Sequence, residues 1–170
     1  MGTVVGLFRD YSNADRAVAM LTEKGFERSE IGVVAAESTV DRHGEVVGAT
    51  NHLPDPVDGA GDGAVKGAIA GLVIGAAALA IPGVGPLFVA GPLASVLTST
   101  VAGAAAGAVA GGLHSALVDM GIGDDDARIY AEGVEAGGVL VTVHTHRKDE
   151  ARDVLRSANA DRVHEGMVRA

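Results

Sequence analysis

Hydrophobic residues follow two different patterns along this chain, one near its ends and another in its middle. Near the ends, short β-branched or apolar runs alternate with segments in which apolar residues recur at helical spacing. We expect strands at 3–8, 31–36 and 139–144, and a short edge strand at 163–168. Helices are expected at about 12–24, 124–136 and 149–158.

Two of these helices have residues that are typical of helix starts and stops. Ser12 or Asn13 can cap the first helix, and Gly25 supplies its stop. The run Asp124-Asp125-Asp126 stands where the first turn of a helix favours negative charge. Gly137-Gly138 then ends that helix before the strongest strand pattern of the sequence.

With the middle set aside, the expected order is β-α-β, insertion, β-α-β. This is the split βαβ pattern of a ferredoxin-like sheet in the α+β class. Residues 1–58 and 120–170 would form this discontinuous α/β domain, and residues 59–119 would be the insertion. We therefore expect the strand at 139–144 to pair with both strands of the first half.

The middle of the chain is a linker followed by an uncharged apolar segment. Residues 37–62 mix acidic residues, Gly and Pro, which favours a linker, and a hairpin around His43-Gly44 is the one element expected there. Residues 67–118 contain no Lys, Arg, Asp or Glu. Two apolar arms flank Ile81-Pro82-Gly83-Val84-Gly85-Pro86, so we expect a helical hairpin.

Glycines recur four residues apart on both arms of this expected hairpin. They are Gly63, Gly67, Gly71, Gly75, Gly103, Gly107 and Gly111. This spacing aligns them on one helix face. A glycine in a helix interior costs roughly 0.5–1 kcal/mol relative to alanine, so the pattern needs a compensating contact. Small residues at this spacing let helix backbones approach closely, as in a glycine zipper, and we predict that these glycines mediate oligomerisation.

The arms are also about as long as a bilayer core of roughly 30 Å requires. The first arm, Gly63 to Ile81, has seven large apolar residues, each contributing about 0.3–0.6 kcal/mol toward insertion. Lys66 stands near its start, and the second arm, from about Leu93 to Leu117, contains hydroxyl side chains and His114. Insertion is therefore marginal, and burial of the hairpins against one another in a soluble homo-oligomer is an equal alternative.

Composition narrows the function classes. The net charge of −9 and the scattered Lys and Arg residues argue against a nucleic-acid partner. The absence of cysteine removes disulfides, thiolate zinc sites and a cysteine nucleophile. The N-terminus lacks the pattern of a secretory signal, so we expect the cytoplasm, or the cytoplasmic face of the inner membrane if the hairpin inserts.

Few residues suggest chemistry, and each has a simpler structural interpretation. His144 and His146 are expected at a solvated strand end, because a metal needs more ligands than this pair supplies. His114 is expected to be a hydrogen-bonded interface group, and the Asp124-Asp125-Asp126 run to cap a helix. We predict no catalytic residue, no cofactor site and no metal site, and the sequence identifies no small-molecule ligand.

Several stretches carry a family resemblance. They are Thr3-Val4-Val5-Gly6-Leu7-Phe8, Lys24-Gly25-Phe26, Ile81-Pro82-Gly83-Val84-Gly85-Pro86, Ala90-Gly91-Pro92-Leu93 and the pattern from Gly121 to Val141. Together they resemble the bacterial general stress proteins, which include heat-induced stress proteins and the general stress protein 17M-like domain. Gly123 and Asp124 depart from the Pro and Glu usual at that helix start. The resemblance covers nearly the whole chain and carries over no catalytic residue.

The resemblance implies a stress-associated protein, in a family some of whose members are described as membrane proteins from hairpin hydropathy. Together with the zipper pattern, it leads us to expect a non-catalytic structural protein that assembles with itself. The alternative is a membrane-anchored module whose hairpin enters and leaves the bilayer, with both halves of the α/β domain on one side. An enzyme or ligand-binding regulator is a third class, because the ferredoxin-like fold hosts many functions.

Overall fold

The computed structural model describes residues 2–36, 39, 69, 77–81, 85–93 and 109–166, which form an α+β fold. The first elements are β1 (Gly2–Phe8), α1 (Tyr11–Glu23), β2 (Ile31–Ala36), β3 (Ala77–Ile81) and β4 (Gly85–Ala90). They are followed by α5 (Val109–Asp119), α6 (Asp124–Glu135), β5 (Val139–Thr145), α7 (Lys148–Ser157) and β6 (Arg162–Gly166). The expected α+β class is confirmed.

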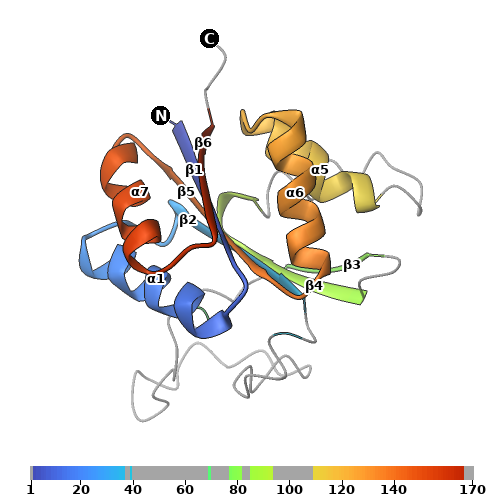
Figure 1. Ribbon diagram of the computed structural model, residues 1–170, viewed down its shortest axis with the longest axis horizontal. Helices are drawn as coiled ribbons and strands as arrows, with labels where there is room; N and C mark the ends of the chain where they lie inside the picture. The colour runs from blue at the N-terminus through green and yellow to red at the C-terminus, as the bar shows by residue number, and fades with distance from the viewer. Residues whose placement is uncertain are drawn as a thin grey trace, which may run out of the picture.

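The strands of the described residues form one six-stranded sheet in the order β3-β4-β2-β5-β1-β6 (Figure 1). Every neighbouring pair is antiparallel. β5 lies between β1 and β2, with Val143 opposite Val4 and Val141 opposite Val33. This confirms that the strand expected at 139–144 pairs with both strands of the first half.

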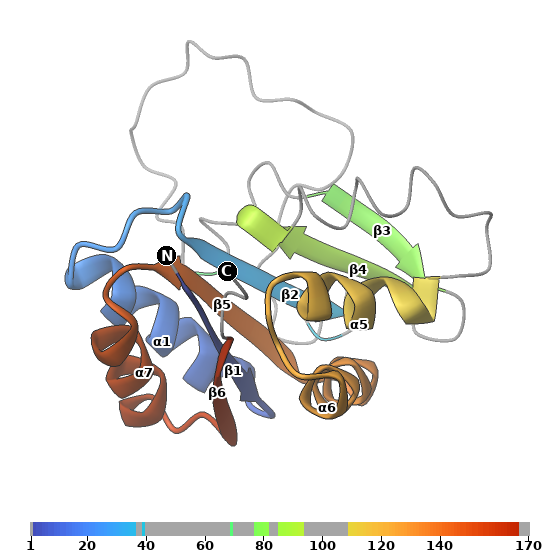
Figure 2. The ribbon, with the colours of Figure 1, turned by 90° about the horizontal axis from the view of Figure 1, so that it is seen from above.

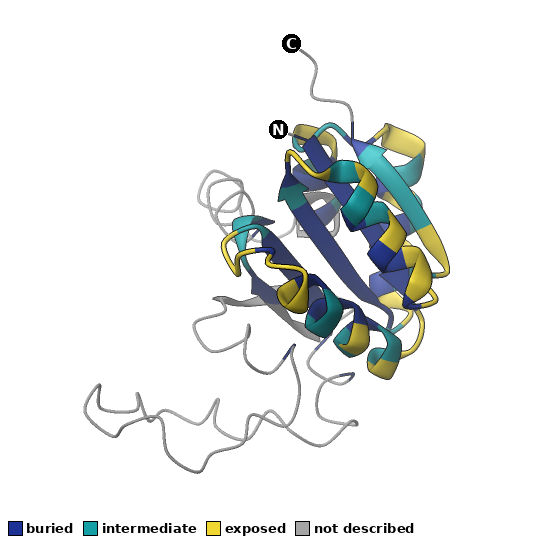
Figure 3. Cartoon of the chain, turned by 90° about the vertical axis from the view of Figure 1, so that its left-hand side faces the viewer, coloured by how far each residue is buried: buried dark blue, intermediate teal, exposed yellow. Residues whose placement is uncertain are grey.

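Helices cover both faces of the sheet. α1 and α7 lie on one face, while α5 and α6 lie on the other (Figure 1, Figure 2). The first face has a buried cluster that includes Phe8, Leu21 and Leu155, and the second has one that includes Tyr130 and Leu140. Because both faces are covered, every residue of β1 and β2 is buried (Figure 3). These strands therefore read as continuous apolar runs in the sequence.

The start of α1 differs from the sequence-based expectation. Asp10, and neither Ser12 nor Asn13, occupies the N-cap, where its backbone is extended and its carboxylate accepts a hydrogen bond from the Ser12 N–H at 2.9 Å. The helix therefore begins at Tyr11, slightly earlier than expected. The expected stop is confirmed, since Gly25 follows the C-cap and has a φ of +78°.

The middle of the chain also departs from the expected helical hairpin. The last residues of the first arm form β3, whereas β4 begins at Gly85 within the expected turn and runs to Ala90, with Ile81 opposite Gly85. The chain does reverse where expected, but between strands. A short apolar run next to Pro and Gly does not distinguish a helix from a strand by periodicity, and β4 here completes the hydrogen bonding of β2.

Other predictions for the middle fall partly outside the described residues. The end of the second arm is helical, as α5. The hairpin expected around His43-Gly44 lies outside the described residues, as does most of each arm. Of the helices in the part of the chain that the structure describes, none is both long and apolar enough to cross a bilayer.

Candidate functional site

The segment between β2 and β5 begins and ends at one place on the sheet. Ala35, next to the end of β2, is opposite Val139, the first residue of β5. Just beyond these strands, the buried Thr39 hydroxyl donates a hydrogen bond to the Gly137 carbonyl oxygen at 2.9 Å. The chain between β2 and β5 therefore starts and ends at neighbouring positions, although its strands β3 and β4 belong to the same sheet. We call these neighbouring positions the base of the inserted segment.

The turn after β4 is packed tightly against β2. Gly91 has a φ of +79°, and a Cβ built on it would overlap the Ile31 carbonyl oxygen and lie 2.8 Å from the Gly32 Cα. Leu93, two residues later, is completely buried. Only glycine fits this backbone contact, which fixes the direction of the chain after β4.

At its other end the inserted segment is joined to α6. Leu113 and Leu117 of α5 are buried in the cluster beneath the second face of the sheet. His114 Nε2 lies 3.1 Å from Asp124 Oδ1 in the first turn of α6. His114 thus lies within ion-pair distance of a carboxylate at an interface between helices, consistent with the interface group expected from the sequence.

The candidate oligomerisation glycines can be located only in part. Gly111 lies in α5. Gly63, Gly67, Gly71, Gly75, Gly103 and Gly107 lie outside the described residues. The structure therefore leaves the expected glycine face as a prediction.

Ile69 makes one further contact between the inserted segment and the α/β unit. Its side chain is completely buried in the cluster of the first sheet face, with Val18 and Leu21 of α1. Its backbone N–H donates a hydrogen bond to Asp15 Oδ1 at 2.9 Å. No local pattern predicted this contact, since Asp15 is one of many acidic residues on helix surfaces.

Charged side chains meet where α6 approaches β6. Asp126 lies 3.3 Å from His164 Nδ1 and 3.8 Å from Arg162 Nη1. One turn along α6, Tyr130 is completely buried and its hydroxyl has no hydrogen-bond partner among the described residues. Burial, reinforced by the negative charge of Asp126 and partly opposed by Arg162, raises the pKa of Tyr130 well above its usual range.

The Asp126–His164 pair resembles the carboxylate–imidazole half of a general-base arrangement. Such a pair needs a nucleophile or substrate proton within hydrogen-bond reach of the imidazole. Within the described part of the chain, His164 has no hydrogen bond to a Ser, Thr or Tyr hydroxyl, and Tyr130 holds its proton tightly. The arrangement is suited to joining α6 to β6.

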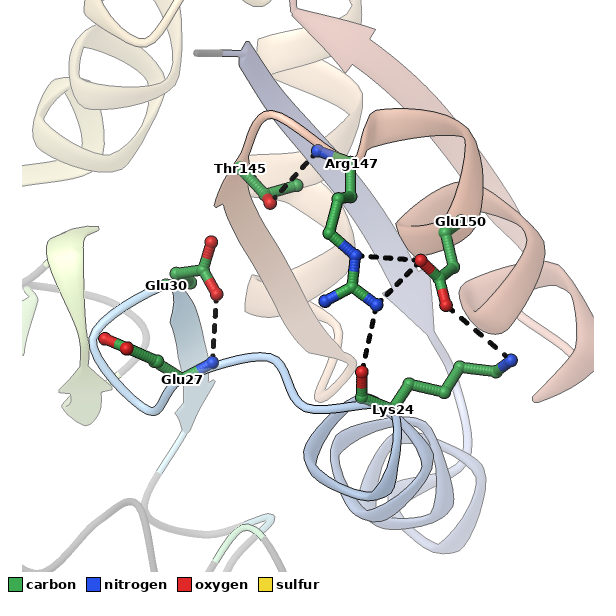
Figure 4. Close-up of polar contacts among 6 residues, drawn as sticks. All are labelled: Lys24, Glu27, Glu30, Thr145, Arg147 and Glu150. Carbon is green, nitrogen blue, oxygen red and sulfur yellow. Dashed lines mark hydrogen bonds and ion pairs between the residues drawn. The ribbon is translucent and has the colours of Figure 1, made fainter.

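A second polar cluster joins α1 to α7 (Figure 4). The Arg147 guanidinium donates to Glu150 at 2.9 Å and to the Lys24 carbonyl oxygen at 2.9 Å, and it lies 4.3 Å above the centre of the Phe26 ring. The Arg147 N–H also donates to Thr145 Oγ1. An arginine side chain can donate several hydrogen bonds in different directions and stack on an aromatic ring at the same time. Arg147 therefore satisfies the carbonyl oxygen of Lys24, the C-cap residue of α1.

The two histidines near the end of β5 have different surroundings. His144 is half-buried, and its Nδ1 lies 3.0 Å from the hydroxyl of Thr3 on the neighbouring strand. His146 is exposed and lies beyond Thr145, the last residue of β5. Within the described residues, no group of three or more His, Cys, Asp or Glu side chains is placed to hold a metal ion.

Comparison of the chain with protein-family models, with curated proteins and with solved structures finds no match. Function is therefore inferred from the residues and the geometry described above.

Proposed function

We propose that this chain is a non-catalytic, stress-associated structural protein whose copies associate through the inserted segment 59–119. The observation that carries this proposal is the base of the segment. Ala35 is opposite Val139, and Thr39 is hydrogen-bonded to Gly137, 98 positions later. Such a base lets an α/β unit carry a long uncharged segment without interrupting the pairing of its central strands.

The α/β unit is proposed to be a ferredoxin-like domain formed by residues 1–58 and 120–170. Each of the units β1-α1-β2 and β5-α7-β6 holds a strand of the other between its own two strands. Their helices α1 and α7 are in contact and contribute to the same buried cluster. These features support a split βαβ arrangement, to which β3 and β4 add two strands beyond β2.

Two features of the segment support association between copies. Residues 67–118 contain no charged side chain, whereas the whole chain has a net charge of −9. Copies therefore repel one another least along this segment. The four-residue glycine spacing favours close packing of helices, with the chain itself as the proposed partner.

The alternative is that the segment inserts in a bilayer and anchors the α/β unit to it. The absence of Lys, Arg, Asp and Glu from residues 67–118 supports this alternative equally, because these side chains oppose insertion most strongly. Under the leading proposal the protein is cytoplasmic, and under the alternative it lies on the cytoplasmic face of the inner membrane.

The two possibilities are separated by fractionation and sizing of the full chain. We expect the protein to remain in the supernatant after ultracentrifugation of a cell lysate, and to give a multiple of the 17.0 kDa chain mass by light scattering without detergent. Recovery in the membrane pellet, with release only by detergent, would support the anchored module. A monomer in the supernatant would contradict both.

A further inference from the structure

The contact between Ile69 and α1 joins the apolar segment to the first face of the sheet, whereas Leu93, Leu113 and Leu117 of the segment are buried on the second face. Ile69 belongs to the stretch without charged residues that we propose to mediate association. Its side chain is nevertheless completely buried in the core cluster of the first sheet face, which also contains Ala17, Leu21 and Val33. A residue of the segment that precedes β3 is thus also buried within the molecule.

Asp15 holds the backbone of the same residue. Ile69 is helical, and its N–H donates to Asp15 Oδ1 at 2.9 Å. A hydrogen bond to an ionised carboxylate is stronger than one between neutral groups. Asp15 therefore holds the backbone of Ile69 from a different element, α1.

We propose that Asp15 and Ile69 form an intramolecular latch that holds the start of the apolar segment on its own α/β unit and opposes its association with a second copy. This inference rests on the proposed function of the segment. The Ile69 side chain cannot be buried against α1 and against another copy at once. Any assembled state that draws the segment away from α1 must first give up this burial and this hydrogen bond.

The strength of the latch sets the expected size of the effect. Loss of a charge-assisted hydrogen bond or of most of a buried isoleucine side chain shifts an opening equilibrium by about tenfold or more. Opening of the latch is therefore expected to increase the fraction of assembled protein at a given concentration by mass action. The latch acts as an autoinhibitory contact within the chain.

The test compares the full-length variants Asp15→Ala and Ile69→Ala with two controls. Glu23→Ala removes a negative charge from an exposed position on the same helix. Asp15→Asn keeps an oxygen that accepts the hydrogen bond but removes the charge, so it should retain part of the latch. Circular dichroism identifies any variant that fails to fold, and the second latch variant then carries the test.

Two readouts are needed. Hydrogen–deuterium exchange of a peptide that contains Ile69 reports whether the latch is open, and light scattering over a range of concentrations reports assembly. We expect Asp15→Ala and Ile69→Ala to accelerate exchange about tenfold or more and to shift the size distribution toward larger species, with Glu23→Ala unchanged.

Each other outcome overturns the latch. Unchanged exchange in both variants would mean that the contact does not hold the segment. Faster exchange with unchanged or smaller assemblies would mean that opening does not favour association, while the proposed function would stand if the parental protein is oligomeric. Faster exchange in protein that remains monomeric but binds phosphatidylglycerol vesicles would assign the released segment to membranes.

Discussion

Gly91 and Gly25 have nearly the same backbone conformation, with φ values of +79° and +78°, but very different surroundings. A Cβ at Gly91 would overlap the Ile31 carbonyl, whereas a Cβ at Gly25 would have no atom within 4 Å. We expect Gly91→Ala to lower the free energy of unfolding by roughly 2–4 kcal/mol, and Gly25→Ala by about 1–2 kcal/mol from backbone strain alone. Urea denaturation of both variants checks this, and equal losses would contradict the close contact of β4 with β2.

Tyr130 provides a second test at the level of a single side chain. Its completely buried hydroxyl has no partner among the described residues, so Tyr130→Phe should leave the free energy of unfolding unchanged or raise it by about 1 kcal/mol. Because burial raises the pKa of Tyr130 in the folded protein, its contribution to stability is complete below the ordinary tyrosine pKa of about 10 and is lost as pH rises above it. The free energy of unfolding, measured by denaturation at pH values from 8 to 11, should therefore fall less steeply with pH for Tyr130→Phe than for the parental protein.

For single residues, the sequence predicted the kinds of residue that begin and end α1 better than it predicted which position has each role. Gly25 was expected to end α1 and does so, because few other residues adopt a positive φ cheaply. The cap was expected at Ser12 or Asn13, but Asp10 is equally suited to it and comes two residues after the end of β1. The contacts of Arg147 with Lys24 and of Asp15 with Ile69 carried no local signal, because the two residues of each pair are far apart in the sequence.

The elements of the two chain ends were predictable because their patterns agree with their packing. The strand expected at 139–144 and the helices expected at 124–136 and 149–158 are found as β5, α6 and α7 with small shifts of their ends. β3 and β4 were not predictable in the same way. The run Ala77–Ile81 is a good helix sequence by composition, and its pairing with β4 depends on the position of β2, which the local sequence does not specify.

The glycine spacing of the inserted segment leads to a prediction at the same scale. We expect Gly71→Leu or Gly107→Leu to disrupt assembly more than Leu72→Ala, although truncation of a buried leucine usually costs roughly 2–5 kcal/mol. A leucine on a glycine face separates two helix backbones over several turns, and symmetry repeats the clash at each equivalent interface. Light scattering of each variant, in buffer and in mild detergent, measures the effect. Gly71→Ala is the matched mild control, and parental sizes for both Gly→Leu variants with dissociation of Leu72→Ala would contradict the glycine contact.

At the scale of the whole molecule, the sheet joins the first and last parts of the chain, and this arrangement can be tested by a covalent link across the base of the segment. Ala35 and Val139 are opposite each other on antiparallel strands and are buried in the same cluster. Such partners have Cα atoms about 4.5–5.5 Å apart, within the range that a disulfide spans. The chain contains no cysteine, so Ala35→Cys with Val139→Cys introduces a single defined pair.

We expect this pair to form an intramolecular disulfide that raises the free energy of unfolding by about 2–4 kcal/mol, because it closes a long loop in the unfolded chain. The control pair Val33→Cys with Val139→Cys lies on the same face but is offset along the strand, since Val33 is opposite Val141, and it should cross-link poorly. Non-reducing electrophoresis distinguishes the products. If association uses segment 59–119, the cross-linked protein must keep the parental size by light scattering, because the link leaves that segment free. Disulfides formed mainly between copies would instead mean that β2 and β5 of one sheet come from two chains, and that the assembly forms by exchange of halves.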